Sequence, residues 1–454
     1  MQLKFGTDGI RNIIGETPFN IEDLKNFSAA IAIWIVQKYG SDSNILIYND
    51  TRESCNWIKS MIKSILMLYK INIYDANILP TPAFFHYYKK IFLKKNKKIN
   101  IDCAIVISGS HNRFNENGIK ILDKFSKINL HDEQIISQIY NKLDNKFDKI
   151  EINYNKFGKN FYKYKYFKED YINNIIRLFD KNLLKNIKIV LDTANGSTYN
   201  IAPIIFKKLG AQVITINNKP DGKNINKNCG SLYTDKLIKK VIKEKALFGF
   251  AFDGDGDRVI AVNRFGQVKD GDDILAILSN SQEYKNQKQI VGTVMSNLGL
   301  ERYLNNYNKE LIRAQVGDKY ILKSLEEKNL LLAGEPSGHI IMKNLLSSGD
   351  GILASIKLSE IAILNNNLNL DSFEKYPQII INIQVKEKKE DLNSENIKNI
   401  IENAKEKISF DGKILIRYSG TENYLRIMTE SKDKLLTENM ALLLAKKLEK
   451  YFNN

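Results

Sequence analysis

Residues 247–257, LFGFAFDGDGD, lead from an apolar strand directly into a turn with three aspartates. The same arrangement, a short apolar strand that ends in a small polar turn, recurs in NILIYNDTRES (44–54), IDCAIVISGSHN (101–112) and IKIVLDTANGS (187–197). Where a helical pattern follows, as in residues 198–211, the pattern predicts a strand, a helix and a second strand. Such units build sheets covered by helices on both faces, and their ligands bind beyond the carboxyl ends of the strands. We therefore expect the polar turns to lie where a substrate binds.

The chain of 454 residues is too long for one hydrophobic core and predicts about three or four domains. RVIAVN (258–263) is expected to open a third strand and helix unit, and the polar tract 365–377 marks the clearest boundary. After this tract, the order of strand and helix patterns changes to strands with two helices, which predicts a small α+β domain. The fold class is α/β, with mixed or parallel sheets. The predicted domains are 1–152, 153–256 and 257–368, all α/β, and 369–454, the smaller α+β domain.

Composition predicts a folded chain with no nucleic-acid partner. Hydrophobic residues make up 43% and charged residues 26% of the sequence, and only 7 prolines occur, so long disordered linkers are not expected. The net charge of +16 raises the question of nucleic acid binding. Lysine, asparagine and isoleucine are abundant in every part of the chain, however, which indicates a general compositional bias. The basic and aromatic stretches 89–100 and 161–171 are also typical of helices that expose lysine and bury tyrosine.

Cysteine usage and hydropathy indicate a cytoplasmic protein. Cys55, Cys103 and Cys229 are far apart and show no CxxC spacing, so neither a disulfide framework nor a zinc site is expected. The first residues lack the apolar core of a signal peptide, and no uninterrupted run of about 18 apolar residues occurs. We expect neither export nor contact with a membrane.

The turn DGDGD is a candidate metal site. Asp253, Asp255 and Asp257 alternate with glycines, so their carboxylates can curl around one divalent cation. An EF-hand loop begins in the same way, but Arg258 and Arg264 stand where that loop needs glycine and glutamate. A solvated acidic turn is the alternative, although three adjacent carboxylates repel one another unless a cation or an arginine offsets them. Three protein ligands leave open positions on the ion, which suits Mg²⁺ bound to a phosphate oxygen.

The turn ISGSHNRFNENGIK (107–120) is the candidate phosphate side of the site. Ser110 follows a buried strand and Gly109, a position that exposes a hydroxyl group, and His111 and Lys120 are nearby cations or proton carriers. A serine next to a histidine in sequence does not establish a hydrolase triad, and no GxSxG motif is present.

Further polar turns offer groups that bind phosphate and sugar. FGTDGIR (5–11) ends in Arg11, and AGEPSGHI (333–340) offers Glu335 and Ser337, which could bind neighbouring sugar hydroxyls. The turn RYSGTENYLR combines arginines and hydroxyls with free glycine N–H groups, a set that binds phosphate. Its members are Arg417, Ser419, Gly420, Thr421 and Arg426. Neither a P-loop nor a GxGxxG motif is present, so a nucleotide is not the first choice.

Five motifs of the chain resemble, in order and spacing, the defining motifs of the α-D-phosphohexomutase superfamily, most closely those of its glucosamine branch. They are FGTDGIR, SGSHN with NGIK, DGDGDR, GEPSGH and RYSGTE. The similarity runs from residue 4 to the final helix. It implies three related α/β domains and a smaller C-terminal domain around a central cleft. It also implies an intramolecular phosphotransferase that interconverts glucosamine 6-phosphate and glucosamine 1-phosphate and supplies UDP-N-acetylglucosamine for cell-wall synthesis. The route would pass through a phosphoserine enzyme and a hexosamine 1,6-bisphosphate.

The resemblance assigns a role to each candidate residue. Ser110 corresponds to the phosphoserine and, with the three aspartates, to the ligands of one Mg²⁺ per site. Lys120 and Arg11 correspond to the cationic pair beside it, and of the two Lys120 is the better proton carrier; His111 completes the catalytic set. The implied substrate-binding residues are Arg258 beside the phosphate, Glu335 and Ser337 at the sugar hydroxyls, and Arg417, Ser419, Gly420, Thr421 and Arg426 at the non-reacting phosphate.

Three positions depart from the glucosamine pattern. Gly109 stands where alanine is more frequent, and Arg113 and Asn423 replace prolines. These changes leave open a phosphoglucomutase or phosphomannomutase that acts on neutral hexose phosphates. A more distant alternative is a basic binding protein on a mutase scaffold, which the intact Ser110 and aspartates disfavour. The expected partner is a phosphosugar, and because dimers occur in the family, a homodimer is one expectation for the assembly.

Overall fold

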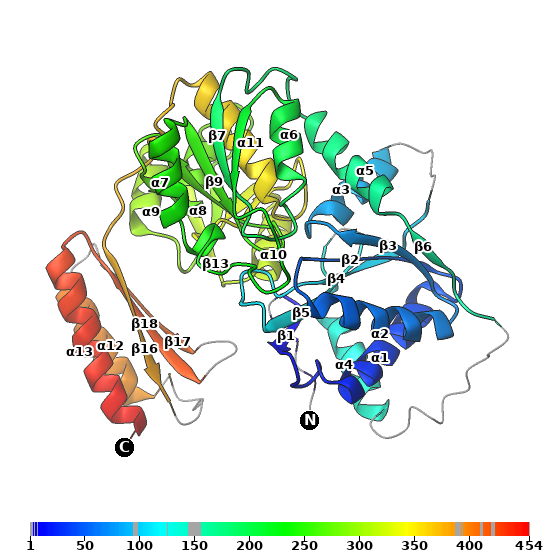
Figure 1. Ribbon diagram of the computed structural model, residues 1–454. Coiled ribbons are helices and arrows are strands. Elements are labelled where there is room, and N and C mark those ends of the chain that lie inside the picture. The colour runs from blue at the N-terminus through cyan, green and yellow to red at the C-terminus, as the bar shows by residue number, and fades with distance from the viewer. Residues whose placement is uncertain are drawn as a thin grey trace.

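The computed structural model describes residues 3, 5–6, 8–93, 99–124, 126–143, 156–385, 392, 394–408, 412–418 and 423–453 (Figure 1). Its strands form four sheets, and each sheet with its helices is called here the first, second, third or fourth domain in chain order. No helix in the described ranges combines the length and the apolar character that a membrane crossing requires.

The first domain contains a six-stranded mixed sheet. Its strands are β1 (Ile10–Ile13), β2 (Asn44–Asn49), β3 (Asn72–Ile78), β4 (Cys103–Ile107), β5 (Glu116–Leu122) and β6 (Asn160–Tyr162), in the spatial order β1-β5-β4-β2-β3-β6. Its helices are α1 (Ile21–Tyr39), α2 (Ser54–Leu68), α3 (Ala83–Leu93) and α4 (Leu130–Leu143). The pairs formed by β2, β3, β4 and β6 with one another are parallel, whereas β5 runs antiparallel between β4 and β1.

The second and third domains repeat this design with smaller sheets. The second has β7 (Lys188–Asp192), β8 (Gln212–Ile216), β9 (Phe248–Phe252), β10 (Val259–Asn263) and β11 (Val268–Lys269), with α5 (Tyr164–Ile176), α6 (Ala202–Lys208) and α7 (Asp235–Glu244). The third has β12 (Gln289–Thr293), β13 (Glu310–Ala314), β14 (Leu332–Gly334) and β15 (Ile340–Met342), with α8 (Gly271–Ser279), α9 (Leu298–Asn306), α10 (Asp318–Glu327) and α11 (Gly351–Leu364). Their strand orders are β11-β10-β9-β7-β8 and β13-β12-β14-β15.

The fourth domain is a three-stranded antiparallel sheet with two helices on one face. Its elements are β16 (Gln378–Gln384), α12 (Glu395–Ile408), β17 (Lys413–Tyr418), β18 (Tyr424–Glu430) and α13 (Lys434–Asn453), with β18 in the centre of the sheet. In Figure 1 this domain lies apart from β4 and β5 of the first domain. The architecture confirms the predicted fold class: three α/β domains with mixed sheets and a smaller C-terminal α+β domain.

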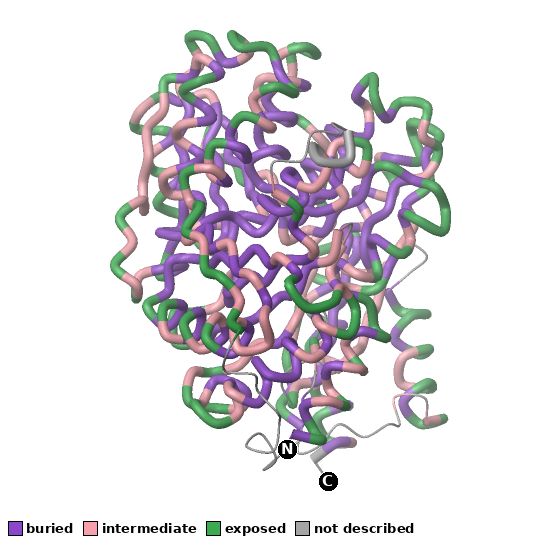
Figure 2. Tube along the Cα trace, turned by 90° about the vertical axis from the view of Figure 1, so that its right-hand side faces the viewer, coloured by how far each residue is buried: buried purple, intermediate pink, exposed green. Residues whose placement is uncertain are grey.

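Alternating apolar residues explain why the sheets are covered on both faces. On β2, Ile45 and Ile47 pack in the cluster that includes α1, α2 and α4, while Leu46 and Tyr48 belong to the cluster that includes α3 and α5. Successive side chains of a strand point to opposite faces, so a continuous apolar run buries both sides. Figure 2 shows the resulting band of buried residues through the interior, with exposed residues at the outer turns.

Side-chain caps fix where several helices begin near the centre of the molecule. Asp270 accepts hydrogen bonds from the backbone amides of Asp272 and Asp273, and the Asp273 carboxylate accepts one from the Asp270 amide, which makes a capping box for α8. Asn297 and Asp350 cap α9 and α11. These caps satisfy amides that have no partner inside the helix.

Each of the first three domains ends its parallel strands in an antiparallel hairpin. The hairpins are β4–β5, β9–β10 and β14–β15, and their connecting turns contain Ser110, the three aspartates and Glu335 respectively. The boundary predicted between 256 and 257 falls inside the second hairpin, so β10, expected to open the third domain, pairs with β9 instead. An alternating strand pattern does not show whether a strand runs parallel or antiparallel to its neighbour. The sequence therefore did not reveal this hairpin.

Candidate functional site

The turn that carries Ser110 meets the aspartate turn of the second domain. Ser110 Oγ donates a 2.8 Å hydrogen bond to Asp253 Oδ2, and both side chains are buried. Ser110 has φ 51°, in the left-handed region that non-glycine residues seldom adopt. His111 Nδ1 lies 3.4 Å from the same hydroxyl oxygen. A serine hydroxyl is thus held against an acidic cluster across a domain boundary.

Asp253, Asp255 and Asp257 form the only cluster of three or more ligand-type side chains in the part of the chain that the structure describes. One ligand atom from each lies within 4.8 Å of the others. Asp255 Oδ1 is buried and accepts no hydrogen bond, and Asp257 Oδ1, also without a hydrogen bond, has the cations Arg258 and His339 only at 3.8 Å. Buried carboxylate oxygens without donors are costly unless a cation binds them. The three aspartates therefore fit a metal ion.

The curl of the aspartate turn depends on backbone donors. Asp253 Oδ1 accepts hydrogen bonds from the amides of Gly256 and Arg258, and Gly256 has φ 75°, which favours glycine. Burial, together with the charges of Asp255 and Asp257, raises the pKa of Asp253 well above its ordinary value. In the absence of metal, Asp253 is thus the member of the cluster that retains a proton most readily.

Lys120 is the central cation of the site. Its Nζ atom lies 2.7 Å from Asp255 Oδ2, 2.8 Å from Asp8 Oδ2 and 3.3 Å from Asp257 Oδ2, and the side chain is fully buried. Burial alone would lower the pKa of Lys120, but the three carboxylates outweigh it and raise the pKa well above its ordinary value. Lys120 is therefore protonated and neutralises part of the acidic cluster.

Asp8 joins the first turn of the chain to this cluster. Its carboxylate pairs with Arg11 and Lys127 as well as with Lys120. Burial opposes ionisation of Asp8, yet these three cations hold its pKa well below the usual range. Asp8 lies within the FGTDGIR motif, which could have indicated this role, but only Arg11 of that motif was predicted as a site residue.

A second ion-pair chain links the third domain to the same place. His339 Nε2 lies 3.1 Å from Asp318 Oδ1, and His339 Nδ1 lies 3.8 Å from Asp257 Oδ1. Burial favours the neutral imidazole, but Asp318 and Asp257 raise the pKa of His339 to about 10. Lys127 Nζ, 2.7 Å from Asp318 Oδ2, ties this pair back to Asp8. These pairings could not be predicted because the partners are far apart along the chain.

The two histidines of the site have opposite charge states. Burial, with the nearby cations Arg258 and Arg11, lowers the pKa of His111 to about 3, so His111 is neutral. His339 is protonated at neutral pH. At neutral pH the site thus contains one neutral and one protonated imidazole.

The candidate sugar turn lies against the aspartate turn. Residues Arg258 and His339 form a backbone bridge, and Val259 N donates to Gly338 O at 3.0 Å. Glu335 accepts a 3.1 Å hydrogen bond from Gly317 N, and Ser337 Oγ lies 3.3 Å from Glu335 Oε2. The structure therefore brings this turn and Arg258 to the Ser110 site.

The candidate phosphate groups of the fourth domain lie elsewhere. Arg417 on β17 and Arg426 on β18 are direct cross-strand neighbours. Burial and the charge of Arg426 lower the pKa of Arg417, as expected for two adjacent cations. Ser419, Gly420 and Thr421 lie outside the described residues. Figure 1 shows β17 and β18 at a distance from β5, so the structure does not bring these arginines to Ser110.

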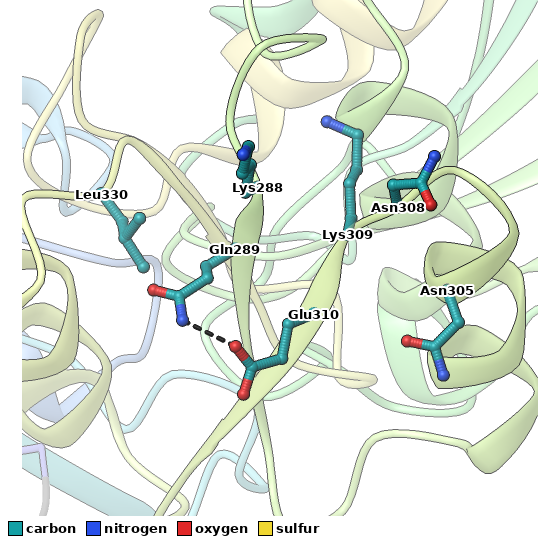
Figure 3. Close-up of a pocket in the computed structure, with 7 residues that line it drawn as sticks. All are labelled: Lys288, Gln289, Asn305, Asn308, Lys309, Glu310 and Leu330. Carbon is teal, nitrogen blue, oxygen red and sulfur yellow. Dashed lines mark hydrogen bonds between the residues drawn. The ribbon is translucent and has the colours of Figure 1, made fainter.

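A hollow of about 670 Å³ lies at the amino ends of β12 and β13 in the third domain (Figure 3). It is lined by Lys288, Gln289, Asn305, Asn308, Lys309, Glu310 and Leu330. These residues surround the amino ends of β12 and β13, whereas Ser110 and the aspartates follow the carboxyl ends of their strands. Lys309 Nζ already donates to the carbonyls of Tyr284, Lys285 and Gln287. We assign no chemistry to this hollow.

Comparison with known proteins identifies four successive matches along the chain. They are described as phosphoglucomutase/phosphomannomutase alpha/beta/alpha domain I (residues 2–147), domain II (169–266), domain III (270–375) and the C-terminal domain (380–447). Curated phosphoglucosamine mutases are similar over almost their whole length. That of Fusobacterium nucleatum is 38% identical and covers 99% of both chains, and that of Thermodesulfovibrio yellowstonii is 39% identical and covers 94% and 95%.

Solved structures share the fold. A phosphoglucomutase/phosphomannomutase family protein from Burkholderia thailandensis has a TM-score of 0.75 at 23% identity and covers 98% and 97% of the two chains. N-acetylphosphoglucosamine mutase of Aspergillus fumigatus, solved in complex with GlcNAc-6P and magnesium, has a TM-score of 0.65 at 13% identity, with 100% and 96% covered.

Proposed function

The chain belongs to the phosphoglucomutase/phosphomannomutase family, and we propose that it interconverts glucosamine 6-phosphate and glucosamine 1-phosphate. The full-length similarity to phosphoglucosamine mutases supports this substrate and confirms the prediction of an intramolecular phosphotransferase. The observation that carries the proposal is the 2.8 Å hydrogen bond between Ser110 and Asp253, which joins a buried hydroxyl to a triple carboxylate site. The product would feed UDP-N-acetylglucosamine synthesis in the cytoplasm, and the three buried, free cysteines fit a reducing compartment.

Ser110 is proposed to carry the phosphoryl group. In the first half-reaction a hydroxyl oxygen of the sugar forms a bond to the phosphorus of phosphoserine, and the bond from phosphorus to Ser110 Oγ breaks. The leaving oxygen needs a proton and the attacking hydroxyl must lose one. The second half-reaction is the reverse, with the other phosphate of the hexosamine 1,6-bisphosphate returning to Ser110.

The charge states of the site fit this exchange. Lys120, protonated among three carboxylates, can donate to the leaving oxygen, and Arg11 and Arg258 add positive charge near the transferred group. His111 is neutral and lies 3.4 Å from Ser110 Oγ, within hydrogen-bond reach of the oxygen that would carry the phosphoryl group. A magnesium ion held by Asp253, Asp255, Asp257 and the Ser110 phosphate would neutralise charge on the phosphoryl oxygens.

The remaining residues are proposed to hold the sugar while it turns. Glu335 and Ser337 would bind sugar hydroxyls beside the aspartate turn. Arg417 and Arg426, with Ser419, Gly420 and Thr421, would bind the non-reacting phosphate. Both arginines line a cavity of about 40 Å³ with Met295 of the third domain, at the junction of the last two domains. Movement of the fourth domain toward Ser110 would bring the second phosphate to the reacting group.

The test compares substrates. Purified protein with Mg²⁺ and a trace of the corresponding bisphosphate is given glucosamine, glucose or mannose 6-phosphate, and kcat/KM is measured for each. We expect kcat/KM to be at least about tenfold higher for glucosamine 6-phosphate, the difference that about 1.4 kcal/mol of selective transition-state binding provides. Equal or faster turnover of a neutral hexose phosphate would contradict the glucosamine assignment. No turnover of any of them would favour the binding-protein alternative.

A further inference from the structure

The carbonyl oxygens on either side of His111 are each held by two donors. Ser110 O accepts from Arg52 Nη2 at 3.1 Å and from Asn226 Nδ2 at 2.8 Å. Asn112 O accepts from the same two groups, at 2.7 Å and 3.0 Å. Two side chains thus grip the turn that presents the Ser110 hydroxyl, and neither was singled out from the sequence.

Arg52 is fixed within the first domain. Its guanidinium is fully buried and forms an ion pair with Asp50. Asp50 also accepts a hydrogen bond from Ser108 Oγ, and Ser108 Oγ in turn accepts one from the amide of Ser110 at 2.9 Å. The amide and the carbonyl of Ser110 are therefore both tied to one buried network.

Asn226 reaches the turn from the second domain. Its side chain is buried, its backbone has φ 56°, and its backbone N–H donates a 2.9 Å hydrogen bond to Ala194 O. Gly254 of the aspartate turn lies directly against the contact, because a Cβ atom there would come within 2.5 Å of Ser110 O and 2.9 Å of Asn226 Nδ2. Asn226 thus couples the position of Ser110 to the domain that carries the three aspartates.

We propose that Asn226 is a positioning residue, which together with Arg52 holds the Ser110 turn so that the hydroxyl faces Asp253. The proposal rests on the proposed function, because it gives Ser110 the role of phosphoryl carrier. The left-handed conformation of Ser110 is unfavourable for a residue with a Cβ atom, so hydrogen bonds from outside the turn are needed to maintain it. In-line transfer is sensitive to displacements of about 1 Å, which can cost on the order of 100-fold in rate.

The structure separates positioning from substrate binding. Asn226 donates to the Ser110 and Asn112 carbonyls, whereas the groups proposed to bind the non-reacting phosphate, Arg417 and Arg426, lie on the fourth domain. Loss of the Asn226 contacts is thus expected to lower kcat and to leave KM nearly unchanged.

The chain offers a matched control in the same loop. Asn228 also has a left-handed backbone, with φ 52°, but its side chain is exposed. Replacement of either asparagine by alanine carries the same backbone cost, and only Asn226→Ala removes the donor to the Ser110 turn. Asn226→Asp keeps the shape of the side chain and places an oxygen against two carbonyl oxygens.

The experiment measures transfer of labelled phosphate from glucosamine 1,6-bisphosphate to unphosphorylated enzyme in a single turnover, together with kcat, KM and the melting temperature. For Asn226→Ala we expect transfer and kcat to fall about 10- to 100-fold with KM within about twofold, and for Asn226→Asp a larger fall. Asn228→Ala should stay within about twofold of the unmodified chain in all of them. The positioning role would be overturned if Asn226→Ala transferred phosphate at the rate of Asn228→Ala. It would also be overturned if the loss of kcat/KM in Asn226→Ala came from a rise in KM and not from a fall in kcat. If the unmodified chain itself takes no label, the proposed function fails instead.

Discussion

Replacement of Lys120 by methionine tests the electrostatic balance of the site. The side chain keeps most of its volume but leaves Asp8, Asp255 and Asp257 without the ammonium group that lies 2.7–3.3 Å from each of them. Lys120, Asp255 and Asp257 are almost completely buried and Asp8 is half-buried, so solvent screens the two buried pairs little. Removal of one partner from a buried ion pair typically costs about 3–5 kcal/mol.

That free energy translates into a large thermal shift. For a domain of about 150–250 residues, 1 kcal/mol corresponds to about 2–4 °C, so Lys120→Met should lower the melting temperature of the first domain by about 6–20 °C in EDTA. The uncompensated carboxylates should also attract Mg²⁺ more strongly. A tenfold gain in affinity adds about 1.4 kcal/mol of stabilisation at saturating metal, or about 3–6 °C more than in the unmodified chain.

Differential scanning calorimetry with EDTA and with Mg²⁺ measures both effects. Lys59→Met is a suitable control because Lys59 is also a buried lysine of the first domain, bound to Asn49 and Asp75 away from the aspartate turn. It should lower the melting temperature without changing the Mg²⁺ increment. The reasoning would be refuted if Lys120→Met melted like the unmodified chain, or if both variants gained the same increment from Mg²⁺.

Three further outcomes follow from the same structure. Burial and two neighbouring carboxylates raise the pKa of Asp253, so Mg²⁺ should displace its proton below that pKa and bind more tightly as pH rises. Calorimetric titrations at a series of pH values, each in buffers of different ionisation enthalpy, should show proton release that declines as pH rises; buffer-independent heats at every pH would contradict this. Arg417→Met should raise KM about 10- to 150-fold with kcat nearly unchanged, because it removes one charge-assisted hydrogen bond of about 1.5–3 kcal/mol. A fall in kcat at constant KM would exclude ground-state phosphate binding by Arg417. Glu430→Ala removes the acceptor of the Leu298 backbone amide at the junction of the third and fourth domains. Cleavage by a protease in the linker 365–377 should then accelerate about fivefold or more. An unchanged rate would show that this contact does not hold the domains together.

Strand and turn patterns indicated Ser110, Lys120 and the three aspartates as site residues, but not Asp8, Arg52 or Asn226, which also contact this site. Ser110 and the aspartates follow buried strands of two different sheets, so the strand rule places each turn at the carboxyl edge of its own sheet. The resemblance to phosphohexomutases indicated that the two turns meet. The structure places Ser110 Oγ and Lys120 Nζ in direct contact with members of the aspartate cluster. The roles of these residues stay predictions until the chemistry is measured.

The pairings of charged residues could not be predicted. Lys127 and Asp318 are far apart in the chain, and a lone lysine after a strand or an aspartate at a helix start is typical of a solvated surface. Their burial follows from the meeting of the first and third domains. The same holds for Asn226, whose sequence context indicates only a turn, because its role depends on carbonyl groups that belong to another domain.

The most direct test of the account is the location of the phosphate on the enzyme. After brief incubation with phosphate-labelled glucosamine 1,6-bisphosphate and Mg²⁺, the protein is digested and the labelled peptide is sequenced by mass spectrometry. The account predicts one label, on Ser110, that unlabelled glucosamine 6-phosphate removes and that Ser110→Ala does not acquire. A label on any other residue, or retention of the label in Ser110→Ala, would contradict it.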